Sequence, residues 1–162
     1  MPIILGIDPG LAATGYGVVS ADGGRFTWLE HGVITTRAED RPGTRLAAIA
    51  GQLETLILRV VPHIAGVESL FFTKNISSAI PVAQARGVVL LTLEQHGIMA
   101  EEYTPQIIKQ AVVGAGQADK EQVTQMVRII LGLAEAPRPD HAADALAAAI
   151  TRFNLSEAPR VQ

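Results

Sequence analysis

The chain has 162 residues, the size of one ordinary domain. Hydrophobic residues make up 48% of it and charged residues 18%, a composition that excludes intrinsic disorder, and the absence of cysteine excludes disulfides and thiolate metal sites. The net charge of −3 argues against a nucleic-acid partner unless some of the carboxylates hold cations.

The first third of the sequence predicts three strands joined by tight turns. An apolar run over residues 3–7 ends at the turn-forming residues 8–10. Strand patterns over residues 14–20 and 26–34 follow, separated by the turn 22–24. These spacings are typical of antiparallel hairpins.

The middle of the chain alternates helix and strand. Apolar residues at helical spacing predict helices over 44–60 and 76–95, and short apolar strands follow at 64–68 and 98–103. The order of elements predicts an α/β fold with a mixed sheet of about five strands and helices on both faces.

The last third predicts helices. Asp119 and Gln122 have the spacing of a capping box, and an alanine-rich helix is expected over 140–152. Such a helix has a thin, smooth face and can lie close to a sheet. Apolar periodicity is lost after this point, so residues 153–162 are expected to form a flexible tail behind a single domain, 1–152.

Two carboxylates stand where apolar strands end. Asp8 closes the first strand and Glu68 follows the apolar residues 64–67. Each has an ordinary alternative: Asp8 could be a turn residue, and Glu68 could pair with Lys74 or Arg86. If the two strands are parallel neighbours, both carboxylates face the end of the sheet where α/β proteins bind ligands.

A third acidic group lies in the alanine-rich helix. His141 and Asp144 are three residues apart and Asp140 and Asp144 four apart, so all share one helix face. Asp140 is best explained as the helix N-cap, Asp144 could be a favourable charge near the helix start, and His141 could be a surface residue. The small residues beside Asp144 favour instead a functional carboxylate that is held in a closely packed helix.

Carboxylates that converge in a cleft repel one another unless cations intervene. Asp8, Glu68, Asp144 and His141 together would suit Mg²⁺ or Mn²⁺. Two such ions about 4 Å apart form a clamp for phosphoryl chemistry.

Basic and aromatic residues extend this picture to a phosphate-bearing substrate. Phe71 and Phe72 follow Glu68 closely and could stack on bases, or could be a core residue and a dimer contact. Lys109 and Lys120 flank a glycine-containing loop and could contact phosphates, or be solvated helix charges. The expected basic face consists of Lys74, Arg86, Lys109 and Lys120.

Short motifs occur in order along the chain at residues 4–10, 14–18, 84–87, 112–114 and 142–147, with Glu68 followed by Phe71. Together they closely resemble the RuvC family of bacterial Holliday junction resolvases. The resemblance runs from about residue 3 to residue 151, nearly the whole chain.

This resemblance implies an RNase H-like fold and a homodimeric, metal-dependent endonuclease that nicks two strands of like polarity across a four-way DNA junction. It also implies cooperation with a RuvAB branch-migration complex. Asp8, Glu68 and Asp144 match the family's catalytic carboxylates, and Phe71 matches its aromatic at the junction centre.

Lys109 and Lys120 match the family's motif lysines near the DNA. His141 stands where many relatives carry a fourth Asp, and we expect it to be a metal ligand that favours Mn²⁺.

Two other functions fit parts of the pattern. Sugar-kinase and actin-like ATPases also begin with a strand that ends in Asp-x-Gly, but their architecture needs two domains and this chain supplies one. A junction-binding module without catalysis is the second alternative. No uncharged run reaches the ~18 residues that a membrane span needs, so we expect a cytoplasmic protein without a membrane partner.

Overall fold

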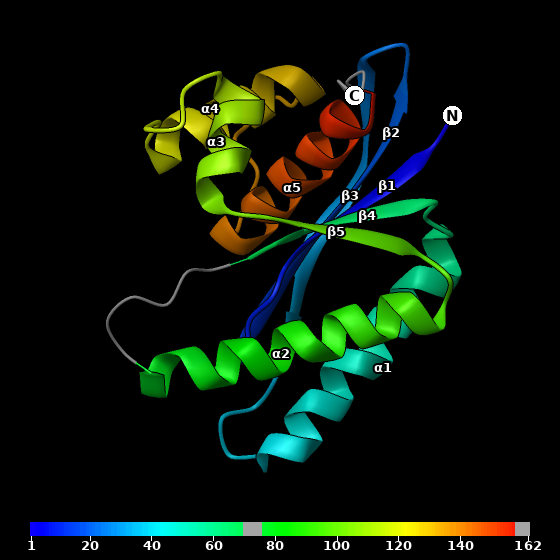
Figure 1. Cartoon of the computed structure of the whole chain (residues 1–162), viewed down its shortest axis with the longest axis vertical. Helices are drawn as coiled ribbons and strands as arrows, with labels where there is room; N and C mark the ends of the chain where they lie inside the picture. Colours follow the sequence, from blue (N-terminus) through cyan, green and yellow to red (C-terminus); the bar gives the residue numbers. More distant parts are fainter. Residues whose placement is uncertain (70–75, 158–162) are drawn as a thin grey trace, which may run out of the picture.

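A mixed sheet forms the centre of the computed structural model, which describes residues 1–69 and 76–157 (Figure 1). Within this part of the chain the sheet has five strands in the order β3-β2-β1-β4-β5. β1 (Ile3–Asp8), β2 (Ala13–Asp22) and β3 (Arg25–Thr35) form an antiparallel meander. β4 (Ile64–Glu68) and β5 (Met99–Tyr103) run parallel to β1. The predicted mixed α/β sheet is confirmed.

Helices cover both faces of the sheet, as expected (Figure 1). α1 (Pro42–Val60) and α2 (Ile76–Gln95) lie on one face. α3 (Pro105–Val113), α4 (Lys120–Leu131) and α5 (Asp140–Glu157) lie on the other.

Alternation along β1 distributes its side chains between the two hydrophobic cores. Ile4 belongs to the core beneath α3, α4 and α5, whereas Leu5 and Ile7 belong to the core beneath α1 and α2. Because side chains of a strand alternate between faces, Asp8 falls on the same side as Ile4, toward α5.

α5 lies unusually close to the sheet. A Cβ atom on Gly6 of β1 would fall 1.8 Å from the carbonyl oxygen of Ala145, and one on Gly15 of β2 would fall 2.0 Å from that of His141. Only glycine fits opposite the helix at these positions, since a real Cβ does not approach backbone so closely. The alanine-rich sequence of α5 supplies the complementary thin face.

The C-terminal end of α5 corrects one expectation. The helix continues to Glu157, whereas the sequence predicted a flexible tail from residue 153. Phe153 is buried and makes an edge-to-face contact with Phe26, with ring centroids 5.3 Å apart. This contact comes from a strand distant in sequence, so the local pattern did not show it. Residues 158–162 of the predicted tail lie outside the described residues.

The start of α5 corrects the expectation that Asp140 is the helix N-cap. Asp140 is its first residue rather than its N-cap, because the Pro139 carbonyl accepts hydrogen bonds from the Ala142 and Ala143 N–H groups at 3.0 and 3.1 Å. The Asp140 carboxylate lies instead 3.6 Å from Lys120 Nζ.

Candidate active site

Two carboxylates meet at the carboxyl ends of β1 and β4. These strands are parallel neighbours with Ile7 opposite Val67, so Asp8 and Glu68 leave the sheet side by side. The predicted arrangement of the two strand ends is therefore confirmed. Asp8 is buried, and Glu68 is partly exposed at the rim.

Asp144 reaches the same place from the first turns of α5. Its position follows from the close packing of α5 over Gly15, which sets the start of the helix against β2 beside Asp8. One carboxylate oxygen from each of Asp8, Glu68 and Asp144 lies within 4.8 Å of the others. Three segments far apart in the sequence thus form one acidic cluster, with a spacing that could hold a metal ion.

His141 lies beside this cluster but contributes to it through Asp8. Its Nδ1 atom is 2.9 Å from Asp8 Oδ2, and its side chain is half exposed. The imidazole therefore contacts the carboxylate that is most deeply buried in the cluster. Its expected role as a metal ligand stays a prediction.

Burial and mutual repulsion raise the pKa values of the clustered carboxyls. Burial raises the pKa of Glu68 to about 8, and the neighbouring Asp8 and Asp144 charges add to the shift. Burial likewise raises the pKa of Asp8 to about 6, although its hydrogen bond with Glu68 opposes this shift. The pKa of Asp144 is also raised by burial, against the favourable charge of Lys120. A cation between these groups would oppose the shifts, because it favours the ionised carboxylates.

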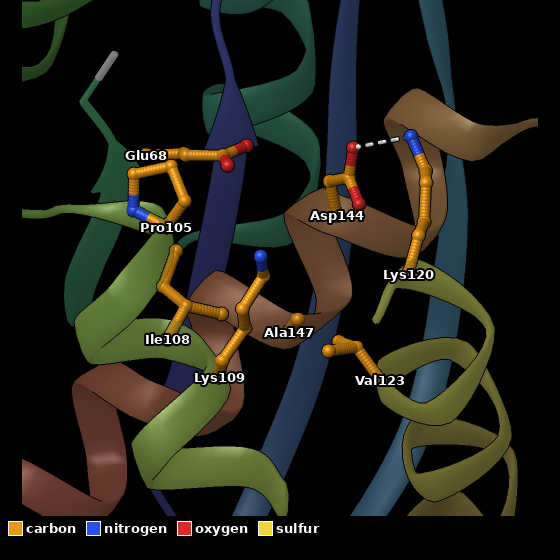
Figure 2. Close-up of a pocket in the computed structure, with 8 residues that line it drawn as sticks. All are labelled: Glu68, Pro105, Ile108, Lys109, Lys120, Val123, Asp144 and Ala147. Carbon is orange, nitrogen blue, oxygen red and sulfur yellow. Dashed lines mark hydrogen bonds and ion pairs between the residues drawn. The ribbon is translucent and has the colours of Figure 1, made fainter. Parts of the chain in front are cut away.

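Two lysines approach the carboxylates from neighbouring helices. Lys120 Nζ donates to Asp144 Oδ2 at 3.3 Å, and although burial alone would lower the pKa of Lys120, the Asp144 carboxylate outweighs it and raises the pKa. Lys109 points from α3 into the space between Glu68 and Asp144 (Figure 2). Both predicted lysines therefore lie at the acidic cluster.

A cleft joins these charges to an apolar wall (Figure 2). Its lining residues are Glu68, Pro105, Ile108, Lys109, Lys120, Val123, Asp144 and Ala147. The apolar members did not emerge from the sequence, although Pro105, Ile108 and Lys109 have the spacing of one helix face. The cleft thus combines an anionic end, two cations and an apolar wall.

The structure places one of the other residues predicted to bind DNA in an ion pair and does not describe the remaining three. Arg86 of α2 is engaged by Glu102 of β5: its guanidinium Nε and Nη2 atoms donate to the two carboxylate oxygens, with the Nη2 to Oε2 distance at 2.7 Å. This ion pair neutralises part of the expected basic face, a partner that the sequence reasoning missed. Phe71, Phe72 and Lys74 lie outside the described residues.

Known proteins match this chain over nearly its full length. The sequence model described as crossover junction endodeoxyribonuclease RuvC matches residues 4–152. The chain belongs to the RuvC family. The RuvC of Treponema denticola is 52% identical over 161 residues, which cover 99% of this chain and 90% of that protein. The RuvC of Chloroflexus aggregans is 53% identical, with 90% of this chain and 89% of that protein covered.

Solved RuvC structures share the fold. Thermus thermophilus RuvC in complex with a Holliday junction substrate has a TM-score of 0.91 and 37% identity, with 96% of this chain and 95% of that chain covered. A second Thermus thermophilus RuvC structure has a TM-score of 0.88. The RNase H-like fold is thus confirmed, and the RuvC-family chain is a nuclease whose acidic cluster fits the metal dependence of its family.

Proposed function

We propose that this protein resolves four-way DNA junctions by paired, symmetrical nicks, in homologous recombination and DNA repair. The observation that carries the proposal is the meeting of Asp8, Glu68 and Asp144 at one end of the sheet, in a chain that belongs to the RuvC family. The similarity to a RuvC structure that contains a Holliday junction supports the choice of substrate.

The donor set fits divalent cations with a preference for oxygen ligands. The cluster offers carboxylate oxygens within 4.8 Å of one another, and burial makes their joint ionisation unfavourable without a cation. Asp8, Glu68 and Asp144, with His141 beside them, would hold Mg²⁺ or Mn²⁺, in our proposal two ions for each site. Bound ions would supply an activated water and charge stabilisation for the leaving oxygen.

The side chains around the cluster have separate tasks in this proposal. Lys109 and Lys120 would contact the phosphates beside the scissile bond, since both ammonium groups face the cleft. Hydrogen bonding between His141 and Asp8 would fix the orientation of the Asp8 carboxylate. The apolar wall of Ile108 and Val123 would keep bulk water from the reacting phosphate.

A homodimer is the second part of the proposal, because paired nicks require two sites. The outer stripe of α2, defined here as Ile76, Ile80, Gly87 and Leu91, is exposed although α2 also buries Ala85, Val89 and Leu93 on its inner side. A helix that is apolar on both sides requires a cover on its outer face. We propose that a second copy of the chain supplies this cover.

The same composition makes α2, within the described residues, the helix that could cross a membrane by length and hydropathy. Its inner side packs instead in the core with α1 and the sheet, and Arg86 on it pairs with Glu102. A cytoplasmic location remains a prediction from the sequence, and cooperation with a RuvAB complex remains a prediction that rests on the family resemblance.

The decisive experiment uses a synthetic four-way junction, end-labelled on each strand in turn, with Mn²⁺. Nicks at symmetrical positions on two strands of like polarity are expected, with a linear duplex of the same sequence left uncut. Asp144→Asn should bind the junction and fail to cut it, because one carboxylate of the cluster is lost while the fold keeps its shape. Binding without cutting by the unaltered protein would favour the binding module instead.

A further inference from the structure

Lys120 is shared between two carboxylates of α5. Its Nζ lies 3.3 Å from Asp144 Oδ2 and 3.6 Å from Asp140 Oδ2. Asp140 and Asp144 are four residues apart, so successive turns of one helix present both carboxylates to the same ammonium group. The family resemblance assigns no role to Asp140, and its side chain is 79% exposed.

The backbone around Lys120 is fixed. It is the first residue of α4, and the capping box before it is complete: Asp119 Oδ1 accepts from the Gln122 N–H, and Gln122 Oε1 accepts from the Asp119 N–H, both at 2.8 Å. The capping box holds the backbone that carries this long side chain. The position of its ammonium group is therefore set by its two carboxylate partners.

Those two partners are not equivalent. Asp144 belongs to the acidic cluster with Asp8 and Glu68, whereas Asp140 lies outside it, at the exposed start of the helix. The Lys120 ammonium compensates the charge of Asp144, so a cation that binds the cluster competes with the lysine for this carboxylate. Once a metal ion binds Asp144, Asp140 is the carboxylate of this pair that still holds Lys120.

We propose that Asp140 is a positioning residue, which keeps Lys120 at the rim of the cleft when Asp144 binds a metal ion. This inference rests on the proposed function and adds a role that the family's motif residues do not include. Asp140 acts in two ways: it draws the ammonium group away from the metal ligand, and it leaves that group facing the phosphate of the DNA.

A double-mutant cycle tests whether Asp140 acts through Lys120. Mn²⁺ alone is titrated calorimetrically into the full-length protein and into Asp140→Asn, Lys120→Gln and the double variant, without DNA. Asp140→Asn should weaken Mn²⁺ binding about fivefold, because the lysine then relies wholly on Asp144. Lys120→Gln should bind Mn²⁺ more tightly than the unaltered protein yet cut junctions more slowly. Adding Asp140→Asn to Lys120→Gln should change the Mn²⁺ affinity by less than about twofold.

Two further variants make the cycle specific. Asp140→Glu keeps the carboxylate and should restore both the Mn²⁺ affinity and the single-turnover cleavage rate, which we expect Asp140→Asn to lower about fivefold. Glu121→Gln removes the same charge from an exposed position beside Lys120; within residues 1–69 and 76–157 no ion pair of Glu121 is recorded, and this variant should behave like the unaltered protein.

The outcomes separate the inference from the function on which it rests. An equal loss of Mn²⁺ affinity from Asp140→Asn with and without Lys120 would show that Asp140 acts by its own charge, and would overturn the inference. So would an Asp140→Asn protein that matches the unaltered one in both readouts. If the unaltered protein neither binds Mn²⁺ nor cuts a junction, the proposed function itself fails.

Discussion

The two faces of the sheet are packed in different ways. On one face α5 lies so close that glycines are required beneath it, and its residues Ala142, Ala143 and Ala145 to Phe153 are buried. On the other face α2 leaves its outer stripe exposed. The first arrangement fixes the position of the helix that carries Asp144, because α5 lies against the backbone of the sheet. The second leaves an apolar surface exposed, against which we propose that a second copy of the chain packs.

The largest expected effect comes from adding one methyl group beneath α5. In Gly6→Ala the new Cβ would meet backbone atoms of α5, which cannot move aside as a side chain could. The helix and its site residues would have to shift, and we expect a loss of about 3 kcal/mol or more in the free energy of unfolding. Urea unfolding followed by circular dichroism measures it.

The matched control is a glycine on the other face. Gly51 lies in the exposed side of α1, where an added Cβ meets nothing within 4 Å. Gly51→Ala should stabilise the protein by about 0.5–1 kcal/mol, because alanine loses less backbone entropy in a helix. Equal destabilisation by both variants would contradict the asymmetry between the faces.

The second effect breaks the proposed association surface. Ile80 is 52% exposed in the outer stripe of α2, so Ile80→Glu costs the isolated chain little, but it would place charges within a dimer. We expect sedimentation velocity to show a dimer for the unaltered protein and a monomer for this variant, and paired nicks to become independent single ones. Ile129→Glu is the control, since Ile129 is 60% exposed on α4, on the opposite face. A dimer that survives Ile80→Glu would exclude this stripe as the interface.

The sequence predicts the parts of the fold that depend on local pattern. The strand ends at Asp8 and Glu68 and the capping box of Asp119 follow from neighbours in the chain, and the structure confirms them. The contacts that it could not predict join distant segments: Phe153 with Phe26, and Arg86 with Glu102. Each depends on how the sheet and helices are stacked, which periodicity within one element does not encode.

Asp140 illustrates the same limit inside the site. Its sequence context is that of a helix N-cap, and the prediction was wrong by one residue because Pro139 supplies the carbonyl that begins the helix. The convergence of the three carboxylates was expected only if β1 and β4 paired in parallel, a condition that no local pattern decides. The structure meets that condition.

A smaller effect concerns the stability of the metal-free site. The pKa of Glu68 is raised from 4.5 to about 8, so between these values the folded chain holds a proton that the unfolded chain has released. Stability of the metal-free protein must therefore fall as the pH rises from about 4.5 to 8, and the raised pKa of Asp8 acts in the same direction up to about 6.

Glu68→Gln removes this penalty. At pH 8 we expect the metal-free variant to be more stable than the unaltered protein by about 2 kcal/mol, with a smaller difference at pH 5. Added Mn²⁺ should stabilise the unaltered protein by mass action and the variant much less. Thermal unfolding with chelator and with Mn²⁺ at both pH values measures these differences. If Glu68→Gln raises the stability of the metal-free protein less at pH 8 than at pH 5, the sign of the pH effect is reversed and the explanation is refuted.

The smallest effect concerns His141 and the choice of metal. A neutral imidazole is a softer ligand than a carboxylate and suits Mn²⁺ better than Mg²⁺. In the structure the ring contacts Asp8, so His141→Asp would place a further carboxylate against one that already carries a raised pKa. We expect the ratio of Mg²⁺-supported to Mn²⁺-supported cleavage to rise several-fold in this variant, measured with one junction at saturating metal. His141→Asn removes the imidazole and adds no charge, so it should lower cleavage with both metals and also raise the ratio, because the softer ligand is lost. If the ratio stays constant in both variants, His141 orients Asp8 without binding metal.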